Sequence, residues 1–324
     1  MAYQLQGDEF TVVGSTVTYN LPANKAYLAT PNTATSITTA DTGLLDGTLH
    51  INNLPALTDL VCHTAKWYNL DLNSYSLENL DCSAISSTLN LDLTGCPALV
   101  TVDFGGGSVT SVNAAGCAFL TDIIGAGCNN VASITVTGCV SLNKLSTYPQ
   151  NGVLSPLTEV IGLSDCENVT EVTLMQSSLT SFDATGCVKL QYLTVNGSRL
   201  TENIPLANID VTDCPDLVLL DAVKTSITSA DMSGKASLES LYTTNAPLTY
   251  ANVAGTVCIE LFCENGSLPE NVVDDLLAQL VANDVAGGTC ALEGNAPPSA
   301  AGLASKAMLE DPEGLGWTVT VSEE

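Results

Sequence analysis

A six-residue motif recurs along this chain at nearly constant spacing. The segment LTSFDATGCVKLQYLTVNGSRL (179–200) spaces its apolar residues three, two and three apart, which fits neither a helix nor a simple alternating strand. Its FDATGC element has copies that end at Cys96, Cys117, Cys139, Cys166, Cys187, Cys214, Lys235 and Thr256. Successive copies are 21, 22, 27, 21, 27, 21 and 21 residues apart. A fixed internal period of this kind predicts a repeat architecture.

With two fainter copies at 50–57 and 70–77, the chain holds about ten such coils. The apolar corners of one coil cannot be buried by that coil alone, so the coils must stack around a shared interior. We therefore expect a β-rich solenoid with short parallel strands. The two long steps contain PQNGVLSP (149–156) and TENIPLAN (201–208), whose Pro, Gly and Asn favour loops that leave the stack undisturbed.

The pattern L-x-x-L-x-[LC]-x-x-N-x-L, as in LTVNGSRL (193–200) and LYTTNAPL (241–248), resembles the leucine-rich repeat family. The other half of each coil, LDLTGC or FDATGC, is similar to the short 21-residue class found in bacterial and bacteriophage proteins. The resemblance covers residues 50–268 in register. It implies a leucine-rich-repeat stack that binds or supports other molecules and does not catalyse a reaction.

The two ends of the chain depart from the repeat. Residues 9–21 alternate like a β-hairpin, and the tail has helical spacing at 268–284 and 299–310, with strand-like stretches at 289–295 and 316–321. This tail resembles the C-terminal caps of phage and bacterial repeat proteins, which cover the apolar cross-section of the last coil. We predict three parts: an N-terminal β cap or attachment segment (1–48), the solenoid (49–268) and an α/β C-terminal cap (269–324).

The charge balance excludes some partners. Eight Lys and Arg residues against 35 Asp and Glu give a net charge of −27, which leaves no basic patch for nucleic acid. No apolar run reaches the length that crosses a bilayer. The first residues, MAYQLQGDEF, lack a basic start followed by an apolar stretch, so no secretory leader is expected. Only 13% of residues are charged, and Ser, Thr, Asn and Gly fill the positions between apolar corners.

Twelve cysteines suggest either disulfides or metal ligands, but their positions favour packing. Six of them occupy one equivalent corner of successive coils, and Cys62 and Cys82 share another. Small thiols fill buried corners well, and stacked neighbours point their Cβ atoms the same way, which suits no disulfide. Zinc requires clustered ligands rather than a line of thiols. We predict free thiols and synthesis in a reducing compartment.

A second column holds carboxylate and amide side chains four residues before the end of each motif. Closely stacked carboxylates could bind Ca²⁺ or sugar hydroxyls. In the alternative interpretation, each side chain accepts hydrogen bonds from the backbone two residues on, as Asx turns do. The candidate strip comprises Asp71, Asp92, Asn113, Asp183, Asp210, Asp231 and Asn252, with Thr135 and Gly162 at the same position in two coils.

Catalysis has little support in the residues. The chain has one arginine, Arg199, and two histidines, His50 and His63, and none of them lies in a nucleophile, phosphate-binding or metal motif. We therefore predict neither a catalytic nor a cofactor site. Tyr192 and Tyr242 fall between inward-facing leucines, so we expect them to point outward as candidate binding anchors.

These observations lead to a functional hypothesis. We expect a non-catalytic bacteriophage virion component, either a tail-fibre or receptor-binding part or a capsid decoration, made in the host cytoplasm. Its partners would be virion proteins, a host-surface protein or a glycan, and neither nucleic acid nor a membrane interior. The alternatives are a secreted bacterial surface adhesin and a polysaccharide-active β-solenoid enzyme.

Overall fold

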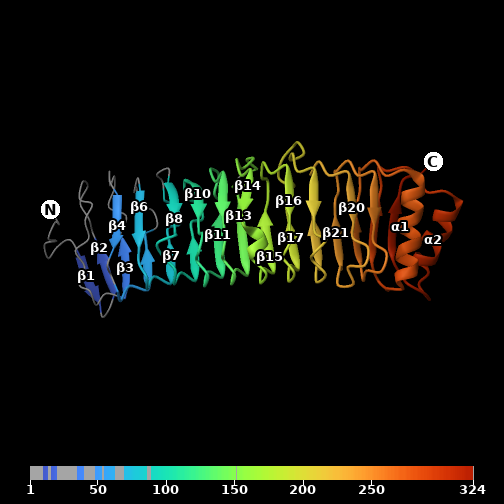
Figure 1. The fold of residues 1–324 in the computed structure, drawn as a ribbon. Coiled ribbons are helices and arrows are strands. Elements are labelled where there is room, and N and C mark those ends of the chain that lie inside the picture. The colour runs from blue at the N-terminus through green and yellow to red at the C-terminus, as the bar shows by residue number, and fades with distance from the viewer. Residues whose placement is uncertain are drawn as a thin grey trace. The chain divides into compact units, whose positions relative to one another are not determined.

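The computed structural model describes residues 10–13, 16–19, 35–39, 48–52, 55–62, 69–85, 89–150 and 152–323. It divides into two compact units, residues 1–169 and 170–324, and each unit is described by itself. Within each unit most strands alternate along the chain between two rows, whereas β1 to β3 (residues 10–39) and β23 to β25 (residues 260–321) all lie in the first row (Figure 1). The apolar side chains of both rows are largely buried. His63, Trp67 and Tyr68 lie outside the described residues.

The first row of the N-terminal unit begins with an antiparallel hairpin, in which Phe10 lies opposite Tyr19. All later neighbours in this row pair in parallel. Parallel pairing therefore starts inside the segment that the sequence assigned to a separate cap. In order across the sheet, the strands are β1 (Phe10–Val13), β2 (Thr16–Tyr19), β3 (Ser36–Thr39), β5 (Asp59–Val61), β7 (Asn79–Asp81), β9 (Thr101–Asp103), β11 (Asp122–Ala126) and β13 (Lys144–Tyr148).

The second row of this unit contains two parallel sheets. One consists of β4 (Thr48–Asn52) and β6 (Asn69–Asn73). The other has the order β8 (Leu89–Asp92), β10 (Val109–Asn113), β12 (Ser133–Thr135) and β14 (Glu159–Ile161), and a 3₁₀ turn, η1 (Leu163–Asp165), follows it.

The C-terminal unit repeats this plan. Its first row is fully parallel and comprises β15 (Glu171–Leu174), β17 (Tyr192–Thr194), β19 (Leu219–Asp221), β21 (Ser240–Tyr242), β23 (Glu260–Phe262), β24 (Thr289–Leu292) and β25 (Thr318–Val321). Its second row comprises two separate pairs, β16 (Ser181–Asp183) with β18 (Asn208–Asp210), and β20 (Ser229–Asp231) with β22 (Tyr250–Asn252).

Strand register stacks equivalent corners into continuous columns. In the C-terminal unit Leu193, Leu220 and Leu241 are register partners, and each is at most 1% exposed. A single coil exposes such leucines, so the stacking of neighbours supplies the core, as the period of the sequence predicts. These parallel strands with aligned apolar columns define a β-rich repeat solenoid.

The cysteine column lies where the sequence places it. All twelve thiols are free and buried. The Cys117 thiol donates to the backbone oxygen of Leu93 in the preceding coil (3.3 Å), and the Cys139 thiol donates to that of Ala114 (3.1 Å). Burial raises the pKa of Cys117 to about 12 and that of Cys139 to about 11. These thiols therefore fill corners and bond to the backbone as neutral groups.

Left-handed backbone turns the chain at the corner before Cys117, Cys139 and Cys187. Gly116, Gly138 and Gly186 have φ values of 83°, 75° and 83°. Residues with a Cβ rarely adopt this conformation, which explains why glycine precedes cysteine in the motif. At the corner after the first-row strands the same conformation is held by residues other than glycine, among them Lys224 and Asn245.

Two helices follow the last second-row strand, α1 (Glu270–Asn283) and α2 (Ala300–Glu310), with β24 between them and β25 after them (Figure 1). These elements agree with the predicted helices and strands of the tail. α1 starts after Pro269 in extended backbone and is followed by the C-cap residue Asp284, whose φ is 56°. Within the described residues, no helix has the length and apolarity needed to span a bilayer.

Candidate functional site

Six residues of the predicted strip lie at the ends of second-row strands. The Oδ1 atom of each accepts a hydrogen bond from the backbone N–H two residues further on, over 2.8–3.3 Å. This is Asx-turn geometry, and it occupies one oxygen of every side chain. The six are Asp92, Asn113, Asp183, Asp210, Asp231 and Asn252. Asp71 differs, because it lies in the middle of β6 between the buried Leu70 and Leu72.

The strip is not continuous in the C-terminal unit. Asp183 is the register partner of Asp210, and Asp231 is the register partner of Asn252. No ladder joins β18 to β20 in the described chain, so Asp210 and Asp231 are not register partners. The motif spacing places Asp183, Asp210 and Asp231 on successive coils, but only the first two are register partners.

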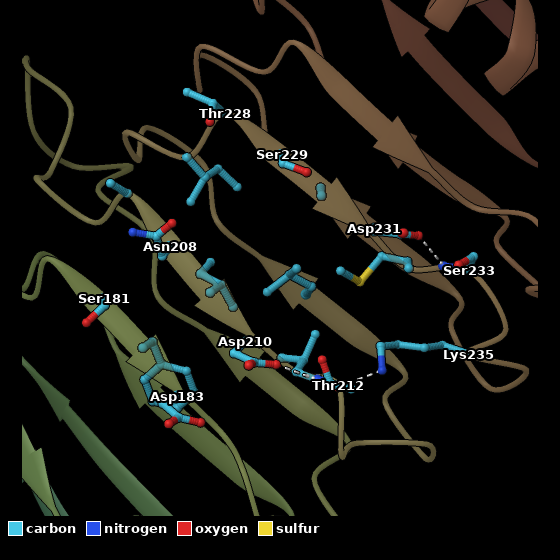
Figure 2. Close-up of a pocket in the computed structure, with 18 residues that line it drawn as sticks. Ser181, Asp183, Asn208, Asp210, Thr212, Thr228, Ser229, Asp231, Ser233 and Lys235 are labelled. Carbon is cyan, nitrogen blue, oxygen red and sulfur yellow. Dashed lines mark hydrogen bonds between the residues drawn. The ribbon is translucent and has the colours of Figure 1, made fainter.

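An open cleft separates β18 from β20 (Figure 2). Its volume is about 750 Å³, and most Cα–Cα distances between the two strands exceed 8 Å. Paired strands lie about 4.8 Å apart, so the coils diverge on this side. The floor is apolar and includes Leu220, Ile227 and Met232. Polar side chains line the two walls, namely Ser181, Asp183, Asn208, Asp210, Thr212, Thr228, Ser229, Asp231 and Ser233.

Lys235 closes one end of this cleft from inside. It occupies the column position of the cysteines and is only 7% exposed. Its Nζ donates to the backbone oxygens of Val211 (2.6 Å) and Cys214 (3.3 Å), which belong to the preceding coil. At the other end, Ser226 N–H donates to the backbone oxygen of Leu206 (2.9 Å).

The surroundings of Asp210 favour its ionised form. The pKa of Asp210 is lowered, chiefly because its carboxylate accepts hydrogen bonds from the Thr212 backbone and hydroxyl, and to a smaller extent because Lys235 is near. Lys235 is the one basic side chain lining the cleft, and it already bonds to two backbone oxygens. The three aspartates therefore give the cleft a negative rim.

The two predicted tyrosines lie on the outer face of the first row. Tyr192 is 45% exposed, and its register partner is Leu219. Tyr242 is only half-buried; its hydroxyl donates to the Glu260 carboxylate, and its ring meets Phe262 edge-on at 5.4 Å between centroids. Burial and the Glu260 carboxylate raise the pKa of Tyr242, so this hydroxyl is a neutral donor at pH 7.

Several residues that contribute to these sites belong to no recognisable sequence motif. Glu260 and Phe262 take part only because parallel register places them beside Ser240 and Tyr242. The cleft walls belong to strands with ordinary repeat sequences. One signal was visible in the sequence, since Lys235 replaces the small thiol in ADMSGK.

The described residues include little that suits metal binding or a reactive thiol. No group of three or more His, Cys, Asp or Glu side chains there is arranged to hold a metal ion. Burial raises the pKa of these thiols, for example to about 11 for Cys214. A reactive cysteine requires a lowered thiol pKa, so these groups are poor nucleophiles.

Comparison with known proteins gives limited information. No protein-family model matches the chain, and no curated protein matches it. Among solved structures it is similar to the functional domain of InlJ from Listeria monocytogenes, which includes a cysteine ladder. The identity is 22%, the alignment covers 81% of this chain, and the TM-score is 0.46. The chain spans 61% of the length of that InlJ chain.

Proposed function

We propose that this chain is a non-catalytic binding protein whose first-row sheet in the C-terminal unit contacts a partner protein. The observation that carries the proposal is the aromatic group on its outer face. Tyr192 and Leu219 are paired in register, as are Tyr242 and Phe262 on the next two strands of the unit. Exposed aromatic side chains on a rigid surface are the commonest anchors of protein interfaces.

The Tyr242 anchor is ordered before any partner binds. Its hydroxyl bonds to Glu260, which also accepts a hydrogen bond from the Ser240 hydroxyl (3.0 Å). The edge-on contact with Phe262 restrains the ring. A side chain that is already restrained loses less entropy on binding, so the same contact contributes more affinity.

Photo-crosslinking in the native cellular setting tests this surface. Benzoyl-phenylalanine in place of Tyr192 should give one dominant adduct, identified by mass spectrometry. The same replacement of Tyr75, which is 81% exposed in a turn of the N-terminal unit, is the matched control and should give none. Equal adducts at both positions, or none at Tyr192, would contradict a binding face there.

More specifically, we propose that this protein is a component of a bacteriophage particle. Free buried thiols suit synthesis in a reducing cytoplasm, and the low charged fraction of 13% suits a surface that recognises a host protein or glycan. The chain would then be a tail-fibre, receptor-binding or capsid-decorating component. Mass spectrometry of purified particles from a lysate should detect it at structural-protein abundance, and its absence would contradict the virion role.

A further inference from the structure

The cleft between β18 and β20 exposes backbone groups that neighbouring coils use in ladders. Ala184 N–H donates to the Asp210 backbone oxygen (2.9 Å), and Met232 N–H donates to that of Asn252 (2.8 Å). Val211 occupies the same motif position as Ala184 and Met232, and its counterpart across the cleft is Asp231. No such bond joins Val211 to Asp231. The facing edges of β18 and β20 therefore present unpaired N–H and C=O groups to the cleft.

Lys235 lies at one end of this opening and bonds across it to the preceding coil. In the preceding coil, the Cys214 thiol bonds to the backbone oxygen of Ala184 at 3.8 Å. Lys235 makes the equivalent bond to Val211, but it needs room for a side chain three heavy atoms longer. Its buried stem lies between the two coils and takes up more space there than a thiol would.

The opening has the length of a short strand. It is bounded by the Ser226–Leu206 bond at one end and by Lys235 at the other. About four residues of each strand lie between these limits, which corresponds to roughly 13 Å of extended chain. A strand placed midway between two others requires them to be about 9.6 Å apart, in keeping with Cα distances that mostly exceed 8 Å.

We propose that this cleft binds a short extended peptide with alternating basic and apolar residues, which adds as a strand between β18 and β20. Its backbone would pair with both open edges, as peptides do when they extend a sheet. Alternate side chains of a strand point to opposite faces. Apolar ones would contact Leu220 and Met232 in the floor, and basic ones would meet Asp183, Asp210 and Asp231 at the rim.

The geometry favours a peptide over the other ligand classes. A glycan lacks the regular alternation of N–H and C=O groups that two strand edges require. A metal ion requires a cluster of ligands, and the described residues contain none. The proposal goes beyond the function proposed above, because it concerns the second row of strands and holds whether or not the outer face of the first row binds a partner.

Binding of a defined peptide to the full chain tests the proposal. The probe is acetyl-Lys-Val-Lys-Val-Lys-amide, followed by calorimetry and by amide hydrogen exchange. We expect saturable binding and at least about tenfold slower exchange at residues 209–211 and 229–231. The same peptide with both valine nitrogens methylated cannot donate to one strand edge, so it should bind at least about tenfold more weakly. Equal binding of the two peptides, or unchanged exchange, would overturn the proposal.

Variants separate strand addition from simple charge attraction. Lys235→Cys restores the thiol column, so the coils should pair and peptide binding should fall at least about tenfold. The matched control, Lys306→Cys, changes a half-buried lysine of α2 that pairs with Glu310 and should bind as the wild type does. Asp231→Asn tests the rim separately: it should weaken binding of this probe, and acetyl-Glu-Val-Glu-Val-Glu-amide should not bind at all. Wild-type affinity in Lys235→Cys, or binding of the acidic peptide, would contradict the assignment.

Discussion

Asn283, the last residue of α1, accepts a hydrogen bond from Gly255 N–H (2.9 Å). One coil earlier, the equivalent Gly234 N–H donates to the backbone oxygen of Ala254. The Asn283 side chain thus provides the acceptor that the backbone of a following coil provides elsewhere in the stack. Gln279 does the same for Val253 N–H, and Asn283 also donates to the Val253 oxygen (2.8 Å). The cap therefore satisfies the polar groups of the last second-row strand as well as covering its apolar side.

Removal of the Asn283 side chain should measure this capping. Asn283→Ala leaves Gly255 N–H without its acceptor and removes one of the donors to the Val253 oxygen, to which Thr256 also donates, so we expect the free energy of unfolding to fall by about 1–3 kcal/mol. Urea unfolding followed by circular dichroism gives the value. Asn271→Ala on the exposed side of the same helix is the matched control and should change it by less than about 0.5 kcal/mol. Equal effects of the two substitutions would show that helix propensity, rather than capping, explains the loss.

A second prediction concerns Gly125, which leaves room for the ring of Phe104 in the preceding coil. A Cβ atom added to Gly125 would lie 2.4 Å from the ring of Phe104, the fully buried residue at the equivalent corner of the preceding coil. Gly125→Ala should therefore destabilise the N-terminal unit by about 1–3 kcal/mol through overpacking. Calorimetric melting temperatures measure the effect. Combined with Phe104→Leu, the same change should cost less than the sum of the two single substitutions, and simple additivity would contradict the contact.

The fold was largely predictable because one period controls it. The spacing of Leu and Cys in each motif sets which side chains face inward, and stacking follows from their need for burial. Stacking in register predicts that Cys117 lies next to Cys96 in the neighbouring coil. The Cys117 thiol does contact the Cys96 backbone oxygen (3.6 Å). The helices of the tail were also predictable, because Val272, Leu276 and Leu280 keep helical spacing and are buried.

The candidate sites were less predictable for a physical reason. A motif fixes the contacts within a coil, whereas the cleft depends on the distance between two coils. Two sequence features mark this place, the TENIPLAN insertion (201–208) before β18 and Lys235 in the column of thiols. Neither gives the distance between β18 and β20. In the same way, Glu260 meets Tyr242 through register with another coil, and no sequence pattern links the two residues.

Alkaline pH should weaken the fold through the thiols. Burial raises the pKa of Cys139 to about 11 from an ordinary value of 9.0. The folded state therefore retains the proton between these values while the unfolded chain loses it. Stability is fully present below pH 9 and falls as pH rises towards 11, by up to about 1.4 kcal/mol per pH unit for each such thiol. Urea midpoints at pH 7, 9 and 10 should show this fall, with a smaller slope in Cys139→Ala. An identical slope in that variant would exclude Cys139 as a contributor.

The aspartate column offers a test of Asx turns against calcium binding. Asn113 and Asn252 make the same turn bond as the aspartates, so the amide oxygen replaces the carboxylate there. Asp210→Asn should therefore leave the free energy of unfolding at pH 7 within about 0.5 kcal/mol, whereas Asp210→Ala should lower it by about 1 kcal/mol, because Thr212 N–H loses its acceptor.

The pH dependence and a calcium titration complete this test. Hydrogen bonds from Thr212 hold the pKa of Asp210 below its ordinary value of 3.8, so its contribution is present above pH 4 and is lost as pH falls further. Asp210→Asn should remove that part of the acid dependence. Calcium at 5 mM should leave the melting temperature of both proteins unchanged, since the aspartate oxygens already accept backbone N–H groups. A calcium-dependent rise in the wild type that Asp210→Asn abolishes would instead establish a cation strip along the second row.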